Sequence, residues 1–255
     1  MSLSYLWALL VKDPLIILST VFLGSVSVIV SYFDPSGRRP DGIALFWAGL
    51  LLRLSGVQVR VRGLENVDAS RGCLFVGNHL SLFDTPVVLA CIPARIRFVV
   101  NAKYVRMPFL GTHLRRCGHF SVEASDVRGS LRSMTRAANA LARGELSIVM
   151  FPEGSRAPGE MGEFREGAAY IALKAGRPVI PFAIEGTREV LPIGSLHVKG
   201  GPVDLVFGRP ISTQGYALRD RERFTRLLHD EVAALRGRFS TGDPELEPAA
   251  IHRAR

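Results

Sequence analysis

Two residues, His79 and Asp84, combine types and spacing that suit acid–base chemistry. An apolar run at 73–76 leads into the polar turn 77–79, so a strand would deliver the imidazole to its own end. An imidazole placed there can act as a general base on a hydroxyl, and a carboxylate can fix its tautomer and steady the imidazolium that forms. No enzyme nucleophile is needed if the substrate supplies the hydroxyl. The alternative is a capped helix start with a histidine on the surface.

A second polar turn follows another apolar strand. Residues 146–151 have the composition of a buried strand. The turn after it brings together an acid, a glycine, a hydroxyl and a cation: Glu153, Gly154, Ser155 and Arg156. Because sites in α/β sheets gather at the carboxyl ends of strands, we expect both turns to line one cleft. That cleft would hold a base, the acid that orients it and a cation for a phosphate.

The elements that must position these residues alternate between strands and helices. Strands are predicted at 57–62, 73–76, 95–100, 118–122, 146–151, 178–184 and 202–207. Helices are predicted at 85–91, 126–143, 166–175 and 219–236, with a broken helix at 105–114. This alternation predicts an α/β fold with a mostly parallel central sheet flanked by helices.

The N-terminal part is apolar and has a different character. Residues 14–33 contain no charged side chain, and a helix of that length, roughly 30 Å, is enough to cross a bilayer. A second apolar segment at 43–52 is too short to span. Two topologies fit: the first helix spans while the second lies in the interface, or both form a hairpin that dips into one leaflet. A pair of ordinary buried helices is the alternative to membrane association.

Charge and composition set the domain plan and the location. We predict membrane-anchoring helices at 1–56, a catalytic domain at 57–239 and a polar tail at 240–255. Most arginines near the anchor follow the first apolar segment, namely Arg38, Arg39, Arg53, Arg60 and Arg62. The positive-inside bias therefore predicts an inner (cytoplasmic) membrane protein whose catalytic domain faces the cytoplasm.

The chain is strongly basic, with a net charge of +9. A basic balance suits an anionic membrane surface or a phosphorylated substrate, and a nucleic-acid partner is not expected because no such motif is present. The three cysteines, Cys73, Cys91 and Cys117, show no metal-ligand or disulfide spacing. A stripe of Arg128, Arg132 and Arg136 on the 126–143 helix is either a solvated face or a surface for an anionic partner.

The two polar turns together resemble a known family. Residues 78–84, Asn-His-x-x-x-x-Asp, and residues 151–156, Phe-Pro-Glu-Gly-Ser-Arg, resemble the first and third sequence blocks of the glycerolipid acyltransferases, in the lysophosphatidic acid acyltransferase branch. Residues 164–181 look like the stretch that leads to the fourth block. The resemblance covers roughly 57–211, and the apolar N-terminus is similar to the membrane anchor of this family.

The resemblance implies an enzyme that moves a fatty acyl group from acyl-CoA or acyl-carrier protein to the free hydroxyl of membrane lysophosphatidic acid, giving phosphatidic acid. His79 would be the catalytic base and Asp84 its support. No cofactor is implied besides the acyl donor, and no metal. The acceptor's phosphate end would bind at Glu153, Gly154, Ser155 and Arg156, with Lys103 as a further basic residue near the cleft or, equally, a surface lysine.

Glu123 departs from the family pattern, because the second block usually ends in an arginine at about this position. A carboxylate there would repel an acceptor phosphate. Either Arg115, Arg116 or Arg128 takes the place of that arginine, or the acceptor is another lysolipid such as a lyso-ornithine lipid. A membrane-binding module that keeps the fold without catalysis is the non-enzyme alternative.

Overall fold

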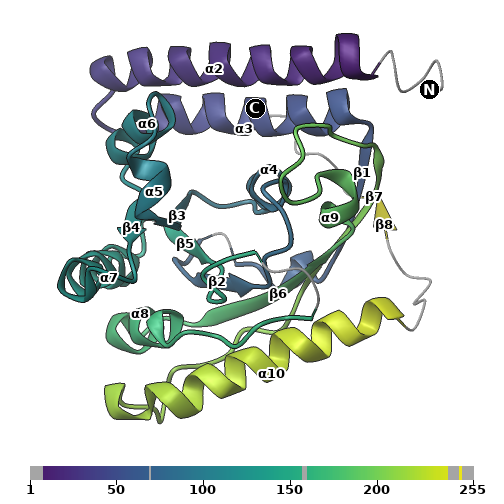
Figure 1. The fold of residues 1–255 in the computed structure, drawn as a ribbon. Coiled ribbons are helices and arrows are strands. Elements are labelled where there is room, and N and C mark those ends of the chain that lie inside the picture. Colours follow the sequence, from purple (N-terminus) through teal and green to yellow (C-terminus); the bar gives the residue numbers. More distant parts are fainter. Residues whose placement is uncertain (1–7, 69, 157–159, 241–246, 249–255) are drawn as a thin grey trace.

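The computed structural model describes residues 8–68, 70–156, 160–240 and 247–248. The strands are β1 (Val57–Arg62), β2 (Leu74–Gly77), β3 (Ile96–Asn101), β4 (Phe120–Val122), β5 (Ser147–Met150), β6 (Val179–Glu185), β7 (Gly201–Phe207) and β8 (Glu247–Pro248). They form one sheet in the order β4-β3-β5-β2-β6-β7-β1-β8 (Figure 1). The strands that carry the two predicted polar turns, β2 and β5, are therefore neighbours at its centre.

Most strand pairs in the sheet are parallel. The strands β4, β3, β5, β2 and β6 run parallel to their neighbours, as do β7 and β1. The pairs β6–β7 and β1–β8 are antiparallel. This arrangement confirms the predicted fold class, a mostly parallel sheet in an α/β fold.

The helices lie on both faces of the sheet. They are α2 (Asp13–Phe33), α3 (Arg38–Ser55), α4 (Asp84–Cys91), α5 (Ala102–Val105), α6 (Leu110–Arg116), α7 (Val127–Ala142), α8 (Gly167–Ala175), α9 (Thr187–Val190) and α10 (Arg221–Ser240), with short turns η1 (Ala8–Lys12), η2 (Leu64–Asn66) and η3 (Leu218–Asp220). Helices α3 and α4 cover one face, and α7, α8 and α10 cover the other (Figure 1).

Strand β2 shows why the central strands are apolar throughout. Phe75 packs into the core under α3 and α4, whereas Leu74 and Val76 pack into the core under α7, α8 and α10. All three side chains are fully buried because helices cover both faces. Truncating Phe75 to alanine would cost about 3–5 kcal/mol, so this strand is a rigid support for the turn that follows it.

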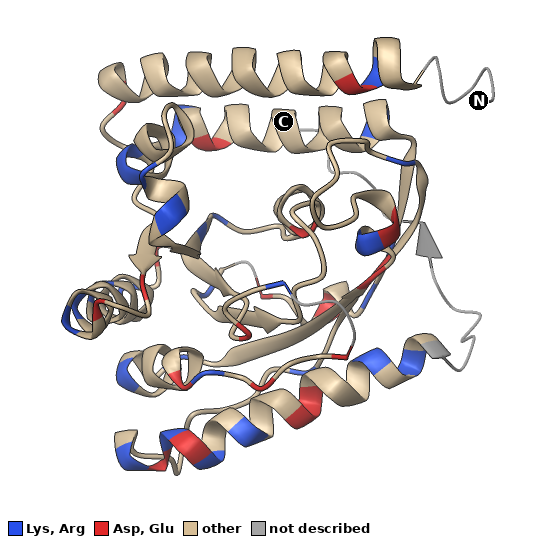
Figure 2. Ribbon diagram, viewed as in Figure 1, with Lys and Arg blue, Asp and Glu red and all other residues tan. Residues whose placement is uncertain are grey.

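The two N-terminal helices lie side by side across one end of the molecule (Figure 1). The segment Ala8–Phe33 is long and apolar enough to cross a membrane, and the short apolar segment predicted at 43–52 lies inside the longer helix α3. Figure 2 shows few charged residues along α2. Large apolar side chains are exposed on both helices: Leu15, Ile17, Leu18, Val21, Phe22, Ile29, Tyr32 and Phe33 on α2, and Leu45 and Phe46 on α3. An exposed apolar surface of this kind is typical of membrane contact.

Both ends of α2 are bound to the rest of the protein. Near its start, the buried Asp13 accepts hydrogen bonds from His197 Nδ1 at 2.6 Å and from the backbone N–H of Val198 at 3.2 Å. Near its end, Arg116 on α6 donates from Nε to Ser31 Oγ and from Nη2 to the Ser31 carbonyl, both at 2.7 Å. The Arg116 guanidinium also stacks 3.7 Å from the centre of the Tyr32 ring.

Helix α3 is held by a partly buried ion cluster. Asp41 accepts from Arg95 Nε at 2.7 Å and from Arg97 Nη1 at 2.8 Å, and Arg97 is almost fully buried. The division into an anchor, a catalytic domain and a tail stays a prediction. Most of the tail predicted at 240–255 lies outside the described residues.

Candidate active site

His79 follows the end of β2 and is held by Asp84, the first residue of α4. The ring Nδ1 lies 2.7 Å from Asp84 Oδ2. The Asp84 side chain is fully buried, and the His79 side chain is 17% exposed. The ring is therefore fixed from the protein side and still reachable from outside.

Asp84 is satisfied by a set of donors from two elements. Besides the His79 ring, Oδ2 accepts the backbone N–H groups of Leu80 at 2.7 Å and Ser81 at 3.0 Å. The other oxygen, Oδ1, accepts from the hydroxyl of Thr187, the first residue of α9. A carboxylate that already accepts these bonds accepts from His79 as well, so Nδ1 carries the proton and Nε2 is left as the basic nitrogen.

The backbone and the other face of His79 are held by the second polar turn. Glu153 Oε1 accepts from the His79 N–H at 2.7 Å, and Oε2 accepts from the Gly162 N–H at 2.9 Å. The Phe151 ring stacks on the imidazole with 4.3 Å between centroids and 16° between planes. The two turns are therefore in contact at His79, and Glu153 binds the protein backbone.

Asn78, the residue before His79, extends the sheet by one step. Its side-chain amide donates to the Ile184 carbonyl and accepts from the Ile184 N–H, both at 2.9 Å. The buried amide thus joins the end of β2 to β6, where a backbone partner is missing. These two hydrogen bonds fix the position of the His79 turn relative to β6.

The rest of the second turn faces α5. Gly154 has a φ of +74°, a left-handed conformation that favours glycine, and it turns the chain sharply away from β5. Arg156 Nη2 donates to the Tyr104 hydroxyl at 3.2 Å. The Lys103 ammonium lies 5.0 Å from the centre of the same Tyr104 ring. Tyr104 therefore brings two predicted phosphate-binding cations, Arg156 and Lys103, to one place, whereas Ser155 is an exposed residue of the turn.

Arg115 and Arg116, predicted to bind substrate, contact other parts of the protein. Arg115 Nη1 donates to the Val105 carbonyl at 2.5 Å, which joins α6 to α5. Arg116 binds α2, as described above. Their part in substrate binding stays a prediction.

Glu123 forms an ion pair with another residue of the chain. Its Oε1 accepts from Arg106 Nη2 at 2.5 Å, and this hydrogen bond lowers the pKa of the Glu123 carboxyl. The sequence pattern missed Arg106, because nothing in its immediate neighbourhood indicates a partner 17 residues away. The Glu123 carboxylate, which stands where an arginine was expected, is thus neutralised by the guanidinium of Arg106.

The cysteines are poor nucleophiles. Burial raises the pKa of the Cys73 thiol to about 11, of Cys91 to about 12 and of Cys117 to about 11. Among the described residues, no group of three or more His, Cys, Asp or Glu side chains could hold a metal ion.

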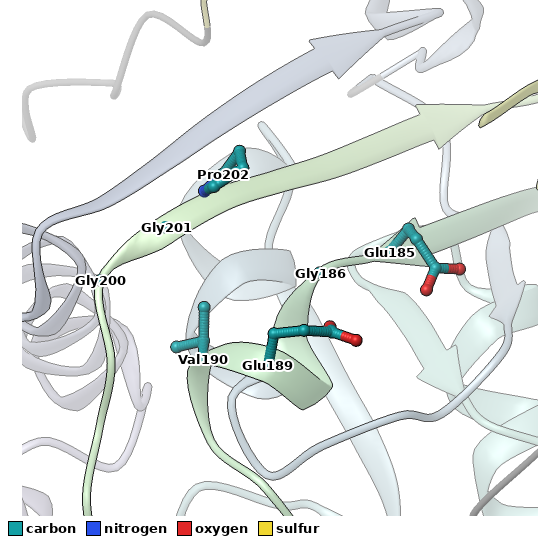
Figure 3. A pocket seen from close by; sticks show the side chains of 7 residues that line it. All are labelled: Glu185, Gly186, Glu189, Val190, Gly200, Gly201 and Pro202. Carbon is teal, nitrogen blue, oxygen red and sulfur yellow. The ribbon is translucent and has the colours of Figure 1, made fainter. Parts of the chain in front are cut away.

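A separate pocket of about 270 Å³ lies beside α9, where Glu185, Gly186, Glu189 and Val190 face the start of β7. Figure 3 shows the two carboxylates on one side of it and no cation. Neither His79 nor Asp84 lines this pocket, although Thr187 lies next to Gly186 in the chain.

The sequence is similar to several known acyltransferases. One relative is the 1-acyl-sn-glycerol-3-phosphate acyltransferase of Limnanthes alba, 25% identical over 183 residues, which make up 71% of this chain and 64% of that protein. The chain thus spans less than two thirds of the length of that relative. The enzyme of the same name from Haemophilus influenzae is 25% identical over 209 residues, 82% of this chain and 85% of the relative.

A solved structure has the same fold. The 1-acyl-sn-glycerophosphate (LPA) acyltransferase PlsC from Thermotoga maritima matches with a TM-score of 0.74 and 24% identity, over 94% of this chain and 96% of that chain. The family model described as Acyltransferase matches residues 58–185, half of the chain. That segment carries both turns that meet at His79, and the chain belongs to this acyltransferase family.

Proposed function

We propose that the protein transfers a fatty acyl group from a thioester donor to the free hydroxyl of lysophosphatidic acid, giving phosphatidic acid. His79 Nε2 takes the hydroxyl proton while the oxygen attacks the thioester carbonyl. The C–S bond breaks and the new ester C–O bond remains. His79 then passes the proton to the departing thiolate. Asp84 keeps Nδ1 protonated and stabilises the imidazolium between these steps.

One observation carries this proposal: the His79 Nδ1–Asp84 Oδ2 bond of 2.7 Å, with Asp84 buried and His79 partly exposed. A pair held in this way presents one basic nitrogen and no enzyme nucleophile. The raised thiol pKa values agree with direct transfer, because a thiol with a pKa near 11 does not form a thiolate at neutral pH. The names of the relatives support the acyl acceptor.

The acceptor's phosphate is proposed to bind near Tyr104. Arg156 and Lys103 both contact this side chain, and a guanidinium beside an ammonium suits a phosphate monoester. Glu123 favours a second candidate acceptor without a free phosphate, such as a lyso-ornithine lipid. The Arg106 partner of Glu123 weakens this objection, because the ion pair has no net charge.

The membrane arrangement is proposed to be a hairpin in one leaflet. Helix α2 is bound to the same domain near its start through Asp13 and near its end through Ser31. A helix that crossed the bilayer would separate these two ends by the membrane. The exposed apolar side chains of α2 and α3 would then enter the leaflet from which the lysolipid comes.

The test uses the purified protein in detergent with acyl-CoA or acyl-carrier protein and lysophosphatidic acid, and it measures release of free thiol. His79→Ala should lower kcat at least about 10²–10⁴-fold, the usual contribution of a general base. His229→Ala is the matched control, since His229 also lies beside an aspartate, Asp230, but on α10. Turnover that survives in His79→Ala would refute the assigned chemistry.

A panel of lysolipids under the same assay distinguishes the two acceptors. Lysophosphatidic acid should have the highest kcat/KM. A higher kcat/KM for an acceptor without a phosphate monoester would replace the proposed substrate and leave the acyl transfer itself intact.

A further inference from the structure

Helix α7 carries a charged face that no other part of the described structure neutralises. Arg128, Arg132 and Arg136 repeat at four-residue intervals, are exposed, and form no ion pair with any described residue. The helix contains no acidic residue between Val127 and Ala142. The nearby Asp126 is engaged with the N–H of Gly129, which it caps at 2.8 Å.

Large apolar side chains lie beside these arginines. Val127 is 73% exposed and Leu131 is 46% exposed. They repeat with the same four-residue spacing, so an apolar row runs next to the basic row along the first half of the helix. The opposite side of α7 is buried in the core, where Ala138 and Leu141 pack against the sheet. The outer face therefore offers cations and apolar contacts together.

The start of α7 and His79 both lie at the carboxyl-terminal ends of the parallel strands: α7 follows β4, and His79 follows β2. Asn101 pairs with Val122, the last residue of β4, and β3 pairs with β5, which pairs with β2 in parallel register. The end of β4 is thus separated from the end of β2 by three strand spacings, roughly 14 Å in total. A flexible thioester arm anchored near Arg128 can cover a distance of this order.

We propose that this face of α7 is the docking surface for an acyl donor carried on a protein, an acidic acyl-carrier protein whose acyl group hangs on a phosphopantetheine thioester. This inference rests on the proposed acyl transfer and names the donor for it. Acidic side chains of the carrier would pair with the three arginines, while Val127 and Leu131 pack on its apolar residues.

The shape of the surface favours a protein over the nucleotide end of acyl-CoA. Small anionic ligands bind in concave sites, whereas the basic face lies on the convex outer side of a helix. The three arginines extend over about 12 Å, which is long for one cluster of phosphates. The described pocket beside α9 is lined by Glu185 and Glu189 and has no arginine or lysine.

The location favours a soluble partner over the membrane. Helix α7 packs against α8 and β4, whereas the long apolar face proposed to enter the membrane lies on α2 and α3. In Figures 1 and 2, α7 lies at the lower left of the molecule and α2 runs along its top.

The experiment compares two donors of the same chain length, hexadecanoyl-CoA and a hexadecanoyl-loaded bacterial acyl-carrier protein, on the full-length protein in detergent. The α7 variant combines Arg132→Glu and Arg136→Glu and leaves Arg128 unchanged, because Arg128 is also a candidate for the acceptor's phosphate. A control variant makes the same change in charge elsewhere, with Arg219→Glu on η3 and Arg223→Glu on α10. Binding of the loaded carrier protein is measured separately, without acceptor, so that it does not depend on turnover.

The α7 variant should raise the KM for the carrier-protein donor by about tenfold or more and weaken carrier binding equally, while the KM for hexadecanoyl-CoA stays unchanged. The control variant should change neither. Unchanged carrier binding in the α7 variant, or an equal rise in KM for both donors, would overturn the inference. If the α7 variant lost binding to anionic vesicles but still bound the carrier protein, the inference would also be overturned, and the basic face would be assigned to the membrane. Absence of thiol release with both donors in the unmodified protein would count against the proposed acyl transfer, whereas carrier binding would still decide the docking surface.

Discussion

Thr187 donates a hydrogen bond from its hydroxyl to Oδ1 of Asp84, the carboxylate whose other oxygen holds the His79 ring. Both Thr187 and Asp84 are fully buried, and they lie 103 residues apart in the chain. The hydroxyl satisfies the one carboxylate oxygen that the His79 turn does not reach. Thr187 therefore positions His79, the proposed base, through Asp84.

Removing this hydroxyl should slow the chemical step without weakening substrate binding. Thr187→Val leaves a buried carboxylate oxygen without its donor, which costs about 1–3 kcal/mol and loosens the orientation of Asp84. We expect kcat to fall about tenfold, with the KM values of donor and acceptor nearly unchanged, and Thr187→Ser to restore most of the activity. Thr225→Val is the matched control, since its buried hydroxyl bonds within α10. A rise in KM at constant kcat would contradict a positioning role.

The pair Glu123–Arg106 should control the affinity for a phosphate acceptor. Both side chains are partly exposed, so breaking the pair costs little stability, and a change in KM reports on the local charge. Arg106→Ala leaves Glu123 unpaired and should raise the KM for lysophosphatidic acid about threefold to tenfold by repulsion. Adding Glu123→Gln to Arg106→Ala should restore the original KM.

The control for this double-mutant cycle is Arg221→Ala, which breaks another exposed pair, Arg221–Glu166, on a different element. An unchanged KM in Arg106→Ala would place Glu123 away from the acceptor. The objection that Glu123 raises against lysophosphatidic acid would then disappear.

The central strands and the contact between His79 and Asp84 could be predicted from the sequence because their signals are local. Apolar runs such as β2 and β5 stand out wherever they occur, and His79 and Asp84 lie five residues apart in the chain. The partners that complete the site come from distant segments: Thr187 and the stacking ring of Phe151 meet the His79 turn only after the sheet has formed. No local pattern marks such contacts, because they depend on strand order.

The sequence pattern also could not predict whether a given strand runs parallel or antiparallel to its neighbour. The strand β7 is mostly buried, as β6 is, yet it runs antiparallel to β6. Burial on both faces gives the same composition to parallel and antiparallel central strands, so composition cannot set the direction. The four-residue helix α9, which carries Thr187, is too short for helical periodicity to appear.

Two histidines near the anchor should make stability depend on pH. Burial lowers the pKa of His113, and burial together with Arg97 holds the pKa of His119 well below its usual value. The Asp41 carboxylate acts on His113 in the opposite direction but does not reverse the shift. Below about pH 6.5 the unfolded chain binds more protons on these two rings than the folded protein does, so stability should fall as the pH drops below that value.

The thermal midpoint in detergent measures this effect at pH 7.5 and pH 5.5. The midpoint should be several degrees lower at pH 5.5, and His119→Gln should reduce the difference, because glutamine keeps an acceptor for the N–H of Phe98 without titrating. His229→Gln, at a partly exposed position on α10, should leave the difference as it is. An equal difference in His119→Gln and the unmodified protein would exclude His119 as the source.

The topology of α2 can be tested at its two ends. The helix has 21 residues, about 32 Å, so its length allows a crossing, and only its contacts argue against one. Lys12→Cys and Arg39→Cys place a thiol before and after the helix, in sealed membrane vesicles treated with a maleimide that cannot cross the bilayer. Because Asp13 and Ser31 bind the same domain, both thiols should react from the same side. The unmodified protein, which has the thiols of Cys73, Cys91 and Cys117, gives the background. Labelling of the two positions from opposite sides would establish a spanning helix, and it would require the contacts of Asp13 with His197 or those of Ser31 with Arg116 to be absent in the membrane.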